Sequence, residues 1–207
     1  MPDALSELAR RRPFVLGSGS PRRRQLLTDV GIRFRVAVSD VDETVRAKEN
    51  PFAYAVRLAE AKATTVAAGC DDDEIVLGGD TVVVLDNVIL GKPEDFEEAV
   101  ATLKHLSGHR HTVCTALALA TKRQLLCSGE ERTNVKFNAV TERQIREYVA
   151  SGEPMDKAGA YGIQGMGAFL VDTIDGNLDN VIGLPLTLLD RLAGQTLRLL
   201  GLVTGRK

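Results

Sequence analysis

A turn rich in small residues runs into three consecutive arginines near the start of the chain, in the segment Gly17–Arg24 (GSGSPRRR). The preceding residues, Pro13–Ser18, are apolar enough for a short buried strand, and Ser20 followed by Pro21 is typical of a helix start. Backbone N–H groups at such a junction bind anions, and Arg binds phosphate oxygens in pairs. Arginine in a first turn opposes the helix dipole, and a bound phosphate would offset that cost. The segment indicates a phosphate site, with a plain turn and solvated arginines as the alternative.

Carboxylates follow two of the predicted strands. Asp40, Asp42 and Glu43 come just after the stretch 34–38, and Asp80 stands between two apolar stretches behind Gly78-Gly79. Oxygen ligands of this kind, together with a phosphate, suit Mg²⁺, which usually binds one or two carboxylates and substrate oxygens. The alternatives are a solvated loop for residues 40–43 and a turn-capping role for Asp80.

Lysines and a glycine-rich segment supply further polar groups. Lys62 flanks the apolar stripe of a predicted helix, and Lys92 follows a predicted hairpin strand. Each is placed either to contact a phosphate as a point charge or to lie at the surface with its stem on apolar neighbours. The segment 153–165 contains Tyr161 and Gln164, whose amide can donate to and accept from the edge of a base. A glycine-rich connection is the alternative there.

Strands and helices alternate irregularly along the chain, with hairpins among them, which indicates an α/β domain with a mixed sheet. Helices are predicted over 20–31, 50–69 and 95–106, from Thr141 with Gln144 completing a capping box, and from Pro185. Strands are predicted over 13–18, 34–38, 75–77, 81–85, 88–90, 111–120, 125–136 and 168–174. We expect a break at Gly78-Gly79 and a tight turn at Asp86-Asn87.

Composition excludes several classes. The 207 residues carry a net charge of −2, no Trp, three Tyr and six Phe, which argues against a basic, base-stacking nucleic-acid surface. No apolar run approaches the roughly 20 residues that a membrane helix needs, and the first apolar stretch is too short for a signal peptide. Three cysteines without a CxxC pair indicate a cytoplasmic protein. His105, His109 and His111 have no cysteine partners at zinc spacing, so we do not expect a zinc site.

Taken together, these segments resemble the Maf family of nucleoside triphosphate pyrophosphatases, in its dTTP/UTP branch. The resemblance covers nearly the whole chain, in the family's order. The matching blocks are LGSGSPRRRQLL (16–27), Val41–Glu43, GGDTVV (78–83), LGKP (90–93), LSGHRH (106–111), GEPMDKAGAYGIQG (152–165) and NVIGLPL (180–186).

The resemblance implies a fold and an activity. The expected fold is a mixed twisted sheet flanked by helices, in an elongated two-lobed Maf/ITPase-like architecture with a central cleft. Residues 1–12 would be an N-terminal extension and residues 13–207 a single Maf-like α/β domain. The implied reaction is metal-dependent hydrolysis of dTTP and UTP, with modified pyrimidine nucleotides as further candidates, to the monophosphate and pyrophosphate. It also implies a divalent cation, Mg²⁺ or Mn²⁺, a homodimer and a house-cleaning role linked to arrest of cell division.

The resemblance also assigns residues. Asp80 is the implied catalytic acid–base group, and the implied metal ligands are Glu43 and Asp80. The implied substrate-binding residues are Ser18, Arg22, Lys62, Thr81, Lys92, Lys157 and Gln164. The neutral amide of Gln164 favours a pyrimidine, whereas the 7-methyl-GTP branch carries an acidic residue near that position. Two alternatives stay open: a 7-methyl-GTP pyrophosphatase, and a non-catalytic nucleotide or nucleic-acid binder that inhibits septum formation.

Overall fold

The structure is a computed structural model that describes residues 3–38 and 40–202. Seven strands form one mixed sheet in the order β2-β1-β3-β5-β6-β7, with β4 paired to β3. Their bounds are β1 Phe14–Leu16, β2 Phe34–Val36, β3 Ile75–Leu85, β4 Val88–Leu90, β5 Arg110–Thr121, β6 Gln124–Phe137 and β7 Val171–Asp175. Strand β1 runs parallel to both β2 and β3, whereas β3–β4 and β6–β7 are antiparallel. The predicted mixed α/β sheet is confirmed.

The helices are α1 Asp3–Arg11, α2 Pro21–Asp29, α3 Pro51–Ala67, α4 Phe96–Leu106, α5 Glu142–Val149, α6 Leu178–Ile182 and α7 Leu186–Leu199. Three short 3₁₀ helices, η1 Glu153–Asp156, η2 Ala158–Ala160 and η3 Gly165–Leu170, follow α5. The predicted N-cap Ser20 and the predicted capping box of Thr141 with Gln144 are present, and Asn50, at the predicted start of a helix, caps α3. Within the described ranges, no helix combines the length and apolar content needed to cross a membrane.

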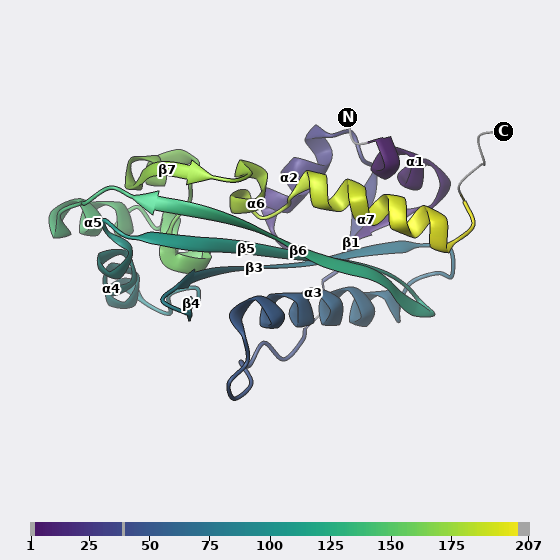
Figure 1. Cartoon of the computed structure of the whole chain (residues 1–207), viewed down its shortest axis with the longest axis horizontal. Coiled ribbons are helices and arrows are strands. Elements are labelled where there is room, and N and C mark those ends of the chain that lie inside the picture. The colour runs from purple at the N-terminus through teal and green to yellow at the C-terminus, as the bar shows by residue number, and fades with distance from the viewer. Residues whose placement is uncertain (1–2, 39, 203–207) are drawn as a thin grey trace. The chain divides into compact units, whose positions relative to one another are not determined.

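The chain divides into two compact units. Unit 1 comprises residues 1–80, 115–131 and 183–207, and unit 2 comprises residues 81–114 and 132–182. In unit 1, α1 and α7 pack on one face of the strands and α3 covers the other (Figure 1). The core of unit 1 is mainly aliphatic and includes Leu16, Leu77 and Leu189, and that of unit 2 combines aliphatic side chains with the rings of Phe137 and Tyr148.

Helix α1 was not predicted from the sequence. It covers most of the expected N-terminal extension, and its Leu5 and Leu8 are fully buried in the core of unit 1. The backbone N–H of Leu5 donates to Asp190 Oδ1 of α7 at 2.9 Å. Residues 3–11 are therefore an integral layer of unit 1.

Two predicted strand boundaries are wrong. Strand β3 runs without a break from Ile75 to Leu85. A Cβ at Gly78 would lie 2.3 Å from the carbonyl oxygen of Ala59 and 2.5 Å from the nitrogen of Ala63, so this glycine lets α3 lie directly against the strand. Residues 168–170 belong to η3, and strand β7 begins only at Val171.

Candidate active site

The turn between β1 and α2 is fixed by hydrogen bonds. Ser20 caps α2 by accepting the N–H of Arg23, and the N–H of Ser20 donates to Ser18 Oγ at 3.3 Å. The N–H of Gly17 donates to the carbonyl oxygen of Leu77 at 2.8 Å, which joins the turn to β3. Ser18 is buried, whereas Arg22 is partly exposed. The predicted junction of strand, small-residue turn and helix start is therefore present.

Arg23 is the buried arginine of this segment, although the sequence analysis singled out Arg22. Its Nη1 donates to Ser18 Oγ at 3.0 Å and to the carbonyl oxygen of Gly79 at 2.9 Å, and its Nε donates to the carbonyl oxygen of Gly183 at 2.8 Å. Burial lowers the pKa of Arg23, while the negative charge of Asp80 acts in the opposite direction. Helical spacing could have revealed this role, since Arg23 shares a face of α2 with the buried Leu27.

Two carboxylates share one lysine. Lys62 Nζ, from α3, lies 2.7 Å from Asp80 Oδ1 and 2.7 Å from Glu43 Oε1. Asp80 is held on β3 and is buried, whereas the Glu43 side chain is 56% exposed on the loop before α3. Sequence analysis picked all three as site residues, and the structure brings them together. The result is a rigid carboxylate–ammonium pair with a second, solvent-facing carboxylate.

The loop that carries Glu43 is tied to α3. Tyr54 Oη donates to the carbonyl oxygen of Glu43 at 2.8 Å, and burial raises the pKa of Tyr54 to about 12, so it stays a donor. Arg57 pairs with Glu49 at 2.6 Å and also donates to the carbonyl oxygen of Thr44. Hydrogen bonding by Arg57 lowers the pKa of Glu49 to about 2. These contacts hold the Glu43 backbone in place while its side chain reaches Lys62.

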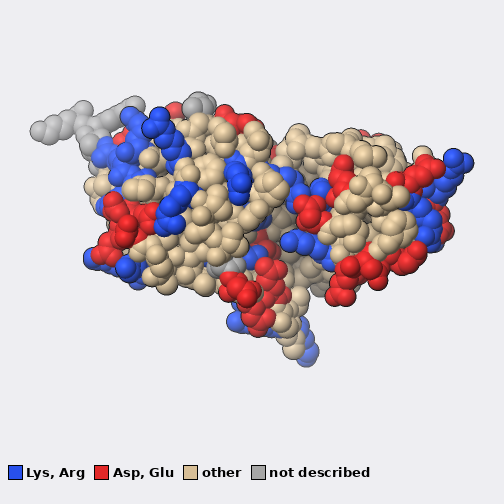
Figure 2. All heavy atoms as spheres, turned by 180° about the vertical axis from the view of Figure 1, so that it is seen from behind, with Lys and Arg blue, Asp and Glu red and all other residues tan. Residues whose placement is uncertain are grey.

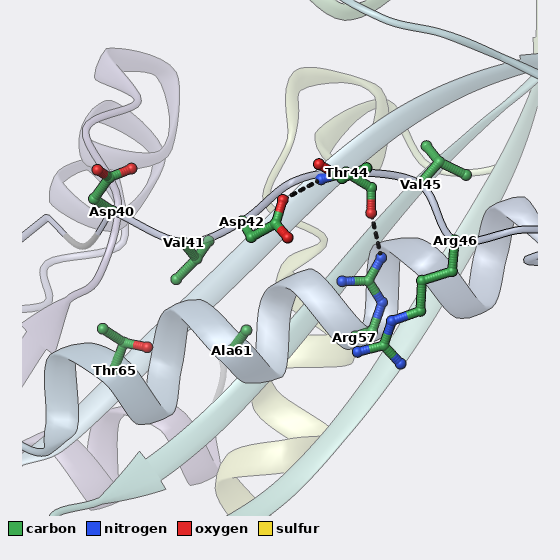
Figure 3. Close-up of a pocket in the computed structure, with 9 residues that line it drawn as sticks. All are labelled: Asp40, Val41, Asp42, Thr44, Val45, Arg46, Arg57, Ala61 and Thr65. Carbon is green, nitrogen blue, oxygen red and sulfur yellow. Dashed lines mark hydrogen bonds between the residues drawn. The ribbon is translucent and has the colours of Figure 1, made fainter.

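A groove of about 440 Å³ lies between this loop and α3 (Figure 3). Its wall includes Asp40 and Asp42, the other two carboxylates that the sequence analysis considered. Asp42 accepts the N–H of Thr44 at 2.9 Å, and hydrogen bonding to Thr44 lowers its pKa. Both side chains are accessible to solvent. Asp42 therefore stabilises the loop, which agrees with the solvated-loop alternative for these two residues.

Unit 2 carries the other four predicted site residues. Thr81 lies on β3 and is partly exposed, and Lys92 is exposed after β4. Lys157 donates to the carbonyl oxygen of Glu153 and lies 2.6 Å from Asp156 Oδ1. The N–H of Gly159 donates to the carbonyl oxygen of Gly91, which places the segments of Lys92 and Lys157 next to each other.

Gln164 is exposed directly before η3. Its side chain makes no hydrogen bond to any residue of the described part of the chain, so its amide is presented to solvent. Glu153 helps to hold this segment, because its carboxylate accepts backbone N–H groups of Met166 and Gly167. No role for Glu153 was predicted, because nothing in the sequence shows which N–H groups its carboxylate accepts.

Comparison with known proteins identifies relatives along most of the chain. A family model described as "Maf-like protein" matches residues 13–196. A dTTP/UTP pyrophosphatase of Shewanella oneidensis is 49% identical over 83% of this chain and 92% of the relative. Those of Hahella chejuensis and Escherichia coli O157:H7 are 46% and 47% identical over 85% and 83% of this chain, and 88% and 86% of the relatives.

A solved dITP/XTP pyrophosphatase from Mycobacterium abscessus aligns with 92% of this chain and 97% of its own length, at 15% identity and a TM-score of 0.43. The family model and the sequence relatives confirm the resemblance that the motifs indicated. This chain belongs to the Maf-like protein family.

Proposed function

We propose that this protein is a nucleoside triphosphate pyrophosphatase that hydrolyses dTTP and UTP. The relatives that carry this name are 44–49% identical over more than four fifths of the chain. The observation that carries the chemistry is the buried Asp80, held at 2.7 Å by Lys62. A fixed carboxylate of this kind can accept a proton from a water molecule, as a general base must.

In the proposed reaction, water attacks the α-phosphorus and Asp80 accepts the proton that the water loses. The new P–O bond forms as the bond to the bridging α–β oxygen breaks, so that the monophosphate and pyrophosphate are released. Lys62 fixes the orientation of the Asp80 carboxylate. Ser18 Oγ already accepts two hydrogen bonds, from Arg23 and from the Ser20 N–H, so its own hydrogen can donate to a phosphate oxygen.

Arg22 and the backbone N–H groups at the start of α2 would hold the rest of the phosphate chain. Donors aimed at the oxygens where negative charge develops stabilise a phosphoryl-transfer transition state. The buried Arg23 keeps the turn in shape through the carbonyl oxygens of Gly79 and Gly183.

The donor set of unit 1 fits a divalent cation, Mg²⁺ or Mn²⁺. Glu43 and Asp80 provide two carboxylates, the number with which Mg²⁺ usually binds when substrate phosphates complete its coordination. The described residues contain no cluster of three or more His, Cys, Asp or Glu side chains suited to a metal, so we propose that the cation binds together with the triphosphate. A bound cation would neutralise phosphate charge and lower the pKa of a coordinated water.

Base selection is assigned to unit 2. The Gln164 amide can accept from the N3–H of uracil or thymine and donate to a neighbouring carbonyl. Thr81 offers a hydroxyl, and Lys92 and Lys157 offer positive charge for phosphate oxygens. The 7-methyl-GTP alternative requires an acidic group near the base, whereas position 164 is a neutral amide.

A nucleic-acid binder without enzyme activity is the rival from another class. Figure 2 shows basic and acidic side chains mixed in small groups on the face it draws, rather than one continuous basic surface. This distribution is a poor match for a phosphate backbone, which needs a basic stripe.

The test is release of pyrophosphate from a panel of nucleoside triphosphates, with Mg²⁺, with Mn²⁺ and with EDTA. We expect turnover of dTTP and UTP that EDTA abolishes, loss of most turnover with retained binding in Asp80→Asn, and weakened dTTP use in Gln164→Glu. Asp72→Asn is the matched control, because this exposed carboxylate forms an ion pair with Arg123 on the surface. Preference for 7-methyl-GTP, or salt-sensitive DNA binding without turnover, would overturn the proposal.

A further inference from the structure

The Glu153 carboxylate and the Tyr148 hydroxyl bind the backbone on both sides of Gln164. Tyr148 Oη accepts the N–H of Gly162 at 3.0 Å, two residues before Gln164. Glu153 Oε2 accepts the N–H of Met166 at 3.0 Å, and Oε1 accepts the N–H of Gly167 at 3.2 Å. The two side chains are joined by a hydrogen bond of 2.9 Å from Tyr148 Oη to Glu153 Oε1. We call this pair and its three N–H donors the Glu153 clamp.

The glycines of this segment are matched to the clamp. A Cβ at Gly167 would lie 2.3 Å from the carbonyl oxygen of Gly162 and 2.6 Å from Tyr148 Oη. Gly165 has a φ of +77°, and a Cβ there would lie 3.0 Å from Glu153 Oε2. The backbone therefore approaches the two side chains more closely than any other residue type would allow at position 167.

Rigid elements support both clamp side chains. Tyr148 lies on α5 and is buried, and burial raises its pKa, so that its hydroxyl stays protonated and can donate to Glu153. Glu153 opens η1, where its own N–H donates to Ser151 Oγ at 3.2 Å. Its carbonyl oxygen also accepts from Lys157, a second predicted substrate-binding residue. Hydrogen bonds to an ionised carboxylate are about twice as strong as neutral ones.

The loop is thus fixed at residues 162, 166 and 167, while the Gln164 side chain between these points is exposed. A recognition group must be held within about half an ångström of its productive place by supporting hydrogen bonds. We propose that Glu153 and Tyr148 are positioning residues that aim the Gln164 amide at the edge of a uracil or thymine base. This inference rests on the proposed function, because it assigns the substrate class through the same glutamine.

The first test measures the clamp in the protein without substrate. Glu153→Gln keeps the shape of the side chain but leaves one acceptor oxygen for two N–H groups and a hydroxyl. Tyr148→Phe keeps the buried ring and removes the hydroxyl that contacts Gly162 and Glu153. We expect the amides of Gly162, Met166 and Gly167 to exchange hydrogen about tenfold faster in Glu153→Gln. Glu147→Gln is the matched control, since that exposed carboxylate of α5 forms an ion pair with Arg143. Unchanged exchange in both clamp variants would overturn the clamp.

The second test asks whether the clamp acts through Gln164. We expect Glu153→Gln to lower kcat/KM for dTTP relative to dCTP about tenfold, mainly through KM, and to leave that ratio unchanged when Gln164 is already Ala. A general folding defect would lower activity on both nucleotides equally and would add to Gln164→Ala. Unchanged preference, or additive effects in the double variant, would refute the positioning role.

If the unsubstituted protein does not hydrolyse dTTP, the proposed function fails by itself. The quantity to measure is then the ratio of the affinities for non-hydrolysable analogues of dTTP and dCTP. An affinity ratio unaffected by Glu153→Gln would refute the inference in that case too.

Discussion

Mild acid should destabilise unit 2 through one buried histidine. His111 on β5 is 2% exposed, and its Nε2 lies 2.8 Å from Tyr161 Oη. Its ring packs edge-on against Phe137 and Tyr161, with centroids 4.8 and 5.4 Å away. Within the described part of the chain its Nδ1 has no hydrogen-bond partner. A protonated imidazole would leave a charged N–H unpaired in this site, and burial lowers the pKa of His111 from 6.5 to about 4.

The sign and size of the effect follow from these two pKa values. Below pH 6.5 the unfolded chain binds a proton that the folded chain does not take up until about pH 4. Stability is therefore complete above pH 6.5 and is lost as the pH falls from 6.5 to 4. The free energy of unfolding falls by about 3 kcal/mol in total, and about 2 kcal/mol of this decrease is reached at pH 5. That is a large fraction of the roughly 5–15 kcal/mol by which a domain is stable.

Urea unfolding at pH 7.5, 6.5 and 5.0 would measure this loss. The ring-proton chemical shift of His111 gives its pKa in the folded state directly. We expect His111→Phe to be less stable at pH 7.5, because Tyr161 Oη loses its partner, but to lose less stability on going to pH 5. The exposed His105→Gln should retain the full pH dependence. An undiminished loss of stability in His111→Phe, or a folded pKa near 6.5, would refute the reasoning.

Two further predictions concern unit 1. Gly78→Ala should lower the free energy of unfolding measured in urea by about 1–3 kcal/mol, because the added Cβ would meet the α3 backbone at Ala59. Gly91→Ala is the control and should be nearly neutral, because the space around Gly91 is open. Equal effects of the two substitutions would contradict the packing argument. The two hydrogen bonds from Arg35 lower the pKa of Glu74 to about 2, so stability from this pair should be lost as the pH falls from 4.5 towards 2. Glu74→Gln should therefore lose less stability than the unsubstituted protein when the pH falls from 5 to 3. If the urea midpoint shifts equally in both proteins over this range, the prediction is wrong.

Local signals were sufficient for many elements of the fold. The turn at Asp86-Asn87 follows from two residues that tolerate positive φ, and both adopt it, at 50° and 65°. The caps at Ser20, Asn50 and Thr141 follow from side chains that accept N–H groups two or three residues away. Each of these interactions lies within one turn of chain, so residue types alone predict it.

Interactions between distant segments were not predictable in this way. Gly78 resembles a strand break in sequence, but the α3 backbone that requires it comes from residues 59–63. Helix α1 buries Leu5 and Leu8 in a core that it shares with α7, which lies at the other end of the sequence. Residue types left the roles of Lys62 and Asp80 open and the family resemblance implied that they are site residues, but only the fold shows that one ammonium contacts both Asp80 and Glu43.

The charges around Asp80 bear on the proposed cation. Arg23 interacts electrostatically with Asp80, Glu43 and Arg22, and Lys62 contacts both carboxylates, so five charges act on one another. These three positive and two negative groups of unit 1 leave an excess of one positive charge, to which Lys92 and Lys157 of unit 2 would add in the proposed complex. Lys62 is engaged by the two carboxylates, and Arg23 donates to backbone carbonyl oxygens. If a triphosphate binds in unit 1 as we propose, a divalent cation held by Glu43 and Asp80 would add positive charge where the two carboxylates would otherwise repel the phosphates.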